Sequence, residues 1–140
     1  MPKSYVLDTS AVFTFTNSEE GSRTVEKLFK DARRRKAVLY MSFVSFMELY
    51  YITWQVKGER LAKEFLVLME SLPVEKVHSS DRLTLSAGRI KATHKLSLAD
   101  AFVAATAIEK KAVLVHKDPE LEVISKYVPT IELPYKQGSN

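Results

Sequence analysis

Two kinds of hydrophobic pattern alternate along this chain. Short apolar runs bounded by polar or turn-forming residues predict strands at 5–7, 38–41, 74–77, 113–115 and 130–133. The run at 74–77 is the weakest of these, and the one at 130–133 resembles an edge strand. Apolar residues at helical spacing predict helices at 19–35, 42–57, 59–72, 81–95 and 98–110.

Strands that alternate with helices are typical of an α/β fold. We therefore predict a single domain with a parallel central sheet of four to five strands and helices on both faces. The domain is expected to span residues 1–136, and residues 137–140 are expected to form a disordered tail.

The helix predicted at 42–57 is apolar around most of its circumference. Ten of its residues from Phe43 to Val56 are large and apolar, so packing one face on the sheet leaves apolar surface over. Such a surface in a small domain suggests an interface with a second protein chain. The alternative is that the following helix, from Glu59, covers it within the same chain.

Composition restricts the chemistry. The 140-residue chain contains no cysteine, which excludes thiol nucleophiles, disulfides and cysteine-ligated zinc. No apolar run approaches the ~20 residues that a membrane span requires. The first residues lack the apolar stretch of a signal peptide, so a cytoplasmic protein is expected.

The net charge of +4 is unevenly distributed. One basic cluster occupies residues 33–36, and a second stretch, 82–99, contains no acid. Either cluster could simply be a solvated helix face. The second stretch ends just before Asp100, so it could also form a basic rim for a polyanionic substrate. Its basic residues are Arg82, Arg89, Lys91, His94 and Lys95.

Four acids stand where a predicted strand ends or a helix begins. In an open α/β sheet these places lie along one edge, where sites are usually built. Four carboxylates gathered there would repel one another without a cation, which favours a divalent metal and phosphate-ester chemistry. The four acids are Asp8, Glu48, Asp100 and Asp118.

Each acid also has a structural interpretation as a helix cap. Asp8 could be an N-cap, and Asp118 precedes a proline, which is a good first helical residue. The other two follow a serine by three residues, in the spacing of a capping box. Capping and metal ligation are compatible, because a helix N-terminus favours negative charge. The serines are Ser45 for Glu48, with Ser42 as a competing cap, and Ser97 for Asp100.

Four segments together resemble a known family. They are Val-Leu-Asp-Thr-Ser-Ala around Asp8, Ser-Phe-Met-Glu-Leu-Tyr-Tyr around Glu48, Leu-Ser-Leu-Ala-Asp-Ala-Phe-Val-Ala-Ala-Thr-Ala around Asp100 and Val-Leu-Val-His-Lys-Asp-Pro-Glu-Leu around Asp118. Their order and spacing resemble the PIN-domain ribonucleases, most of all the VapC toxins of toxin–antitoxin pairs. The resemblance covers residues 5–133.

The resemblance implies a Mg²⁺ or Mn²⁺ site formed by the four acids, with the Ser10 hydroxyl in support. It also implies a homodimer, a small antitoxin as partner, and RNA as substrate. Residues expected to face RNA are Arg89, Lys91, His94 and Lys95. One position departs from the family: two residues before Asp118, where the family usually has threonine, this chain has His116.

The mechanism that we expect uses no side-chain nucleophile. Asp8 and Asp100 would hold the main metal, Asp118 would contribute directly or through water, and Glu48 would bind a second metal or orient the attacking water.

Three other functions compete. A haloacid-dehalogenase-type phosphatase would need a second acid where Ser10 stands. A receiver domain would need an acidic pair after the first strand, although Lys117 would suit it. A PIN-like module that binds RNA or a partner without cutting is favoured only by His116.

Overall fold

The computed structural model describes residues 2–135, so the expected tail at 137–140 lies outside the described residues. The elements follow in the order β1 (Lys3–Leu7), α1 (Thr9–Thr16), α2 (Ser22–Arg33), β2 (Ala37–Ser42), α3 (Phe43–Lys57), α4 (Glu59–Glu70), β3 (Glu75–Val77), α5 (Asp81–Thr93), α6 (Leu98–Lys110), β4 (Val113–His116), the 3₁₀ helix η1 (Pro119–Lys126) and β5 (Thr130–Glu132).

The strands form one five-stranded sheet in the order β3-β2-β1-β4-β5, and every neighbouring pair is parallel. Val6 in the central strand pairs with Tyr40 on one side and with Leu114 on the other. The predicted α/β fold with a parallel sheet is therefore confirmed, including the edge strand near the C-terminal end.

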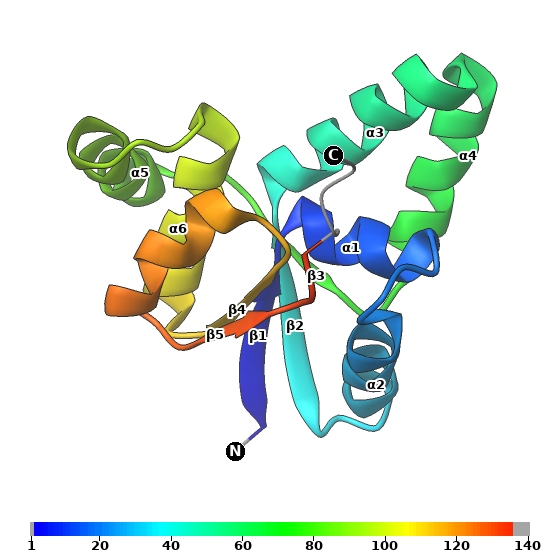
Figure 1. Ribbon diagram of the computed structural model, residues 1–140, viewed down its shortest axis with the longest axis horizontal. Helices are drawn as coiled ribbons and strands as arrows, with labels where there is room; N and C mark the ends of the chain where they lie inside the picture. Colours follow the sequence, from blue (N-terminus) through cyan, green and yellow to red (C-terminus); the bar gives the residue numbers. More distant parts are fainter. Residues whose placement is uncertain (1, 136–140) are drawn as a thin grey trace.

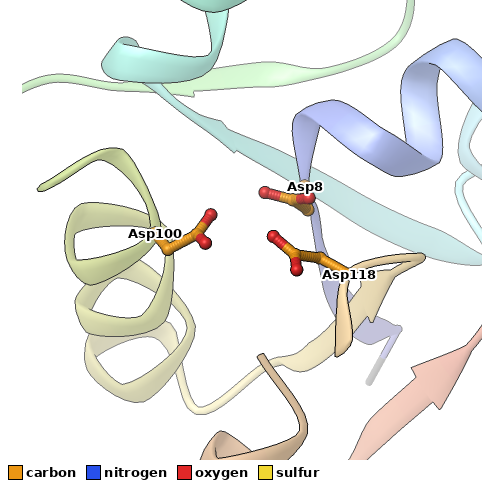
Figure 2. A group of neighbouring side chains, drawn as sticks. All are labelled: Asp8, Asp100 and Asp118. Carbon is orange, nitrogen blue, oxygen red and sulfur yellow. The ribbon is translucent and has the colours of Figure 1, made fainter. Parts of the chain in front are cut away.

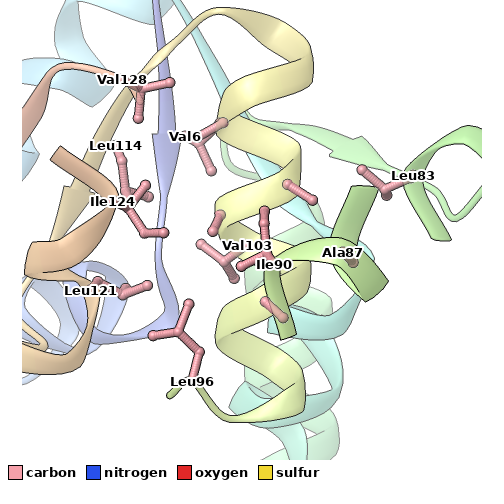
Figure 3. Close-up of a cluster of buried hydrophobic side chains, with 14 of the residues drawn as sticks. Val6, Leu83, Ala87, Ile90, Leu96, Val103, Leu114, Leu121, Ile124 and Val128 are labelled. Atoms are coloured by element: carbon pink, nitrogen blue, oxygen red, sulfur yellow. The ribbon is translucent and has the colours of Figure 1, made fainter. Parts of the chain in front are cut away.

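Helices cover both faces of the sheet because its strands are apolar on both faces (Figure 1). Val6 and Leu114 belong to a core that α5, α6 and η1 close (Figure 3). Their neighbours in sequence, Leu7 and Val115, point to the opposite core, under α1, α2, α3 and α4. The carboxyl ends of the strands lie between these two groups of helices (Figure 1).

Two helices of the structure were not among the predicted elements. Residues of α1 are mostly β-branched, aromatic or threonine, which are weak helix formers. Asp8 caps this helix, and Ala11 and Val12 are buried against the sheet, so tertiary packing overrides propensity. The other unpredicted helix, η1, is a 3₁₀ helix that begins at Pro119.

The predicted helix at 19–35 begins later than expected, at Ser22. The residue before it, Gly21, has φ +97°, a left-handed conformation that suits glycine. A Cβ there would lie 2.9 Å from Cδ of Pro134, so the close approach of the two segments also requires glycine.

Helices α3 and α4 pack against each other and project from the sheet (Figure 1). Contact with α4 does not cover the apolar surplus of α3. Met47 is 52% exposed, and Tyr51 and Trp54 are also exposed. An apolar stripe along α3 thus remains uncovered in the single chain. No helix in the described part of the chain is both long and apolar enough to span a membrane.

Candidate metal centre

Asp8 lies at the carboxyl end of β1, the central strand. Its backbone N–H donates to the Val115 carbonyl at 3.0 Å, which holds it beside β4. Its carboxylate caps α1, and Oδ2 accepts hydrogen bonds from the Ser10 backbone N–H at 3.1 Å and from the Ser10 hydroxyl. The capping interpretation is thus confirmed for Asp8, and it leaves a buried carboxylate oriented at the sheet edge.

Asp100 lies in the first turn of α6. The side chain of Ser97 caps this helix by accepting the Asp100 backbone N–H at 3.1 Å. Small residues keep the helix slim and let it pack closely on the sheet: Ala101, Ala104, Ala105 and Ala107 are all fully buried. This close packing brings a buried carboxylate to the strand ends.

Asp118 follows β4 and caps η1. Its Oδ1 accepts the Glu120 backbone N–H at 3.0 Å, and Pro119 is the first residue of the helix, as predicted. One lone pair is thus used in capping, and the carboxylate remains half-buried beside the other two.

The three aspartates come together although 110 positions separate the first from the last. Asp8, Asp100 and Asp118 each offer one oxygen, and these oxygens lie within 4.8 Å of one another. Figure 2 shows the three carboxylates pointing toward a common centre from β1, α6 and the segment after β4. Carboxylate oxygens at this spacing suit a hard divalent cation, since octahedral ligands ~2.1 Å from Mg²⁺ lie roughly 3–4 Å apart.

Glu48 lies beside this cluster but is not one of the three converging acids. Its Oε1 accepts a hydrogen bond from the Thr9 hydroxyl at 2.7 Å, which ties α3 to the residue after Asp8. The predicted capping box with Ser45 is wrong. Ser42 caps α3 by accepting the Val44 N–H, which places Glu48 in the second turn.

Burial close to one another disfavours the charged forms of Asp8, Asp100 and Glu48. Burial raises the pKa of Asp100 to about 8, with further contributions from the charges of Asp8 and Asp118. Burial also raises the pKa of Asp8, against the opposing effect of the Ser10 hydrogen bonds. Burial, together with the charges of Asp8 and Asp118, likewise raises the pKa of Glu48. A bound cation would relieve this repulsion, so the residues present fit a divalent metal.

His116 is fully buried at the end of β4. Its Nδ1 accepts the Asp118 backbone N–H at 3.1 Å. Burial lowers the pKa of His116, which favours the neutral imidazole that this acceptor role requires. The residue that departs from the family pattern therefore supports Asp118 directly instead of displacing it.

Ser10 connects two parts of the site. Its hydroxyl donates to Asp8 and accepts the Lys117 backbone N–H at 2.9 Å. The Lys117 side chain forms a largely buried ion pair with Glu19 at 3.1 Å. Sequence reasoning missed Lys117 and Thr9 as supports; their positions next to Asp118 and Asp8 were the available signal.

A hollow of about 500 Å³ opens beside Ser10 and Lys117, between α1, α3 and α4. Phe13, Ile52 and Phe65 give it largely apolar walls. It is adjacent to the acidic cluster and is large enough for a few side chains of a partner.

The residues expected to face RNA lie on α5 and the segment after it. Arg89, Lys91 and Lys95 are exposed. His94 is half-buried, and its Nε2 lies 2.9 Å from the Tyr127 hydroxyl. None of the four is among the residues that line the apolar hollow.

A family model described as PIN domain matches residues 5–127. A structure of DNA-bound VapBC from Salmonella typhimurium is similar at TM-score 0.73 and 22% identity, covering 94% of this chain and 98% of that one. VapBC2 from Rickettsia felis, bound to a promoter DNA fragment, is similar at TM-score 0.73 and 18% identity, covering 94% and 99%.

The Mycobacterium tuberculosis toxin VapC20, described as cleaving the sarcin-ricin loop, is similar at TM-score 0.68 and 19% identity, covering 85% of this chain and 93% of that one. At these identities the likeness to solved structures establishes the fold. A comparison with curated protein sequences found no match.

Proposed function

This chain belongs to the PIN-domain family, and from that premise we propose that it is a Mg²⁺- or Mn²⁺-dependent ribonuclease, the toxin of a toxin–antitoxin pair. The observation that carries the proposal is the convergence of Asp8, Asp100 and Asp118 within 4.8 Å. The reaction is hydrolysis of an RNA phosphodiester bond, which requires charge stabilisation at phosphorus and an activated water.

Asp8, Asp100 and Asp118 are the residues that would hold the cation. A divalent cation held there would supply Lewis-acid chemistry, which lowers the pKa of water and offsets charge on the phosphate oxygens. Ser10 orients the carboxylate of Asp8, and His116 fixes the backbone that carries Asp118. No side-chain nucleophile is needed.

Glu48 has a separate role. The Thr9 hydroxyl holds Oε1, and burial, together with the nearby acids, raises the pKa of the carboxyl group. A carboxylate so placed can orient an attacking water and accept its proton, or it can help to hold a second cation.

Two surfaces suit protein partners. The exposed apolar stripe of α3, with Met47, Tyr51 and Trp54, suits a homodimer or a small antitoxin. The apolar hollow beside Ser10 suits the tail of an antitoxin, because a segment bound there would reach the acidic cluster. The resemblance to VapBC complexes supports such a partner.

An RNA substrate implies that the protein acts in the cytoplasm.

The test is cleavage of a pool of total and structured RNA by wild-type protein and Asp8→Asn, each with Mn²⁺, with Mg²⁺ and with EDTA. Metal-dependent cutting that Asp8→Asn abolishes would support the proposal. Asp31→Asn is the matched control, because it makes the same chemical change in an exposed ion pair on α2.

Absence of cutting together with absence of Mn²⁺ binding by calorimetry would favour the alternative, a PIN-like module that binds RNA or a partner without cleaving. His116 was the sequence feature that favoured this alternative. His116 accepts a hydrogen bond from the Asp118 backbone N–H, so it supports this acid and does not displace it. The histidine therefore no longer favours the non-cleaving alternative.

A further inference from the structure

A second hollow, which we call the arginine hollow, lies on the other side of the molecule from α1 and α4. It has a volume of about 590 Å³ and lies between α5, the C-terminal half of α6 and the end of η1. The core beneath it joins these three helices through buried side chains that include Ile90 and Ile124, so its floor is well packed (Figure 3). Its lining residues are Arg82, Leu85, Ser86, Arg89, Ile90, Thr93, His94, Ile108 and Tyr127.

The hollow is basic. Arg82 and Arg89 are seven residues apart on α5, about two turns, so both guanidinium groups lie along one face of the helix. No acid is among the residues found to line it, and neither arginine takes part in an ion pair within the described part of the chain. Two guanidinium groups without a carboxylate partner attract an anion, and their geometry suits phosphate.

An aromatic ring is fixed at the edge of the hollow. The Tyr127 hydroxyl lies 2.9 Å from Nε2 of His94, and the two rings meet edge to face, 5.6 Å apart. The other nitrogen of His94 lies 2.9 Å from the Thr93 hydroxyl. Tyr127 nevertheless remains 49% exposed. A ring that is held at its hydroxyl yet open to solvent is a stacking surface with little conformational freedom to lose.

We propose that the arginine hollow binds one unpaired nucleotide of a single-stranded RNA segment, with the phosphate at Arg82 and Arg89 and the base on Tyr127. Unpaired bases stack on aromatic side chains, whatever their sequence. An acidic peptide would use the arginines but has no need of the exposed ring, so the combination favours RNA.

The position suits a subsite away from the scissile bond. Ile108 is eight residues after Asp100, about 12 Å along α6, and Tyr127 is nine residues after Asp118, roughly 18 Å along η1. A few nucleotides of single strand span such a distance. The inference rests on the proposed ribonuclease function, because it identifies where part of that substrate is held.

The experiment measures binding without cleavage. A fluorescein-labelled single-stranded oligoribonucleotide is titrated with the full chain in EDTA, and fluorescence anisotropy gives Kd at two salt concentrations. The double variant Arg82→Ala/Arg89→Ala is expected to bind at least about tenfold more weakly, with a shallower salt dependence. The matched control is Arg33→Ala/Arg34→Ala, which removes the same charge at the exposed end of α2, on the opposite face of the sheet.

Tyr127 supplies the second measurement. Tyr127→Leu is expected to weaken binding about fivefold or more, whereas Tyr127→Phe, which keeps the ring, stays within about twofold of wild type. An oligomer that is abasic at every position should bind wild type more weakly than the intact oligomer does, but should bind Tyr127→Leu no worse than the intact oligomer does.

Equal losses in the two double-arginine variants would overturn the proposal, because the effect would then be bulk charge. So would unchanged affinity in Tyr127→Leu, or tighter binding of a labelled hexaglutamate peptide than of RNA at the same arginines. Because the assay contains no metal, it measures RNA binding under conditions in which no metal-dependent cleavage occurs. A failure of cleavage therefore does not imitate a failure of the hollow.

Discussion

Asp8 and Asp100 belong to one cluster, yet their surroundings differ. Asp8, at the end of the central strand, accepts two hydrogen bonds from Ser10 that stabilise its charge. Burial raises the pKa of Asp100, on the facing helix, to about 8, and the charges of Asp8 and Asp118 add to this rise. Burial raises the pKa of Asp8 as well, but there the Ser10 hydrogen bonds oppose the rise. The comparison teaches that the strand side of the cluster carries its own stabilising donors, whereas the helix side carries a repulsion that a cation would relieve.

The largest expected effect comes from removing either carboxylate. If the proposed function holds, Asp8→Asn and Asp100→Asn should each reduce cleavage by a factor of at least about 10³, since each removes a proposed ligand of the cation. Their metal-free stabilities should separate at pH 8: Asp100→Asn melts above wild type because repulsion is relieved. Asp8→Asn stays near wild type, since asparagine caps a helix about as well. Thermal denaturation in EDTA measures this, with Asp31→Asn as control.

A lower melting temperature for Asp100→Asn than for wild type would contradict the comparison. It would mean that Asp100 contributes to the fold as a cap more than it strains the cluster.

The third aspartate, Asp118, has a different support again, a hydrogen bond from its backbone N–H to His116. His116→Leu removes the acceptor for the Asp118 N–H and should weaken Mn²⁺ affinity about 10–100-fold, as loss of such outer contacts does in metal sites. His116→Asn keeps an acceptor of similar reach and should retain most of the affinity. Calorimetry measures both, and equal losses in the two variants would show that His116 acts only by filling space.

Ser10→Ala should remove the hydroxyl donor that distinguishes the surroundings of Asp8 from those of Asp100. Asp8 would lose the donor hydroxyl, and the Lys117 N–H would lose its acceptor, so stability should fall by about 1–3 kcal/mol. Ser71→Ala, whose exposed hydroxyl donates to the Leu68 carbonyl, is the control and should cost under ~0.5 kcal/mol. Urea denaturation compares them, and a neutral Ser10→Ala would refute the supporting role.

The smallest expected effect is a pH dependence without metal. Because the pKa of Asp100 is raised from 3.8 to about 8, the folded chain retains a proton that the unfolded chain has released between these values. Stability in EDTA should therefore fall as pH rises from 5 to 8.5, by a few degrees in melting temperature. Mg²⁺ should reduce this slope, and Asp100→Asn should lack most of it; a rise in stability with pH would have the wrong sign.

Much of the fold was predictable because the strands are short apolar runs and most helices have regular periodicity. The two missed helices show the limit. The α1 sequence favours extended structure locally, and it is helical because Asp8 caps it and the sheet buries one side. The 3₁₀ helix η1 is too short and irregular for a periodic signal.

The site was predicted as four acids, and the structure brings three of them together with the fourth beside them. For Glu48 the sequence left two serines as possible caps of α3, and the structure selects Ser42, which places Glu48 in the second turn. Thr9 and Lys117 act on distant partners, Glu48 and Ser10, and no spacing along the chain reveals these two hydrogen bonds. His116 acts on Asp118, two residues away, so only its direction of support needed the structure.

The sequence by itself determined the strands, the helices with regular periodicity, the parallel sheet and the order of the acids, since these follow from local patterns of apolar and polar residues. Only the tertiary structure decided which carboxylates face one another, which are held by neighbours, and that a tyrosine after η1 meets a histidine after α5. The physical reason is that charge repulsion, burial and hydrogen bonding act over a few ångströms in space, between residues whose separation along the chain carries no information about that distance.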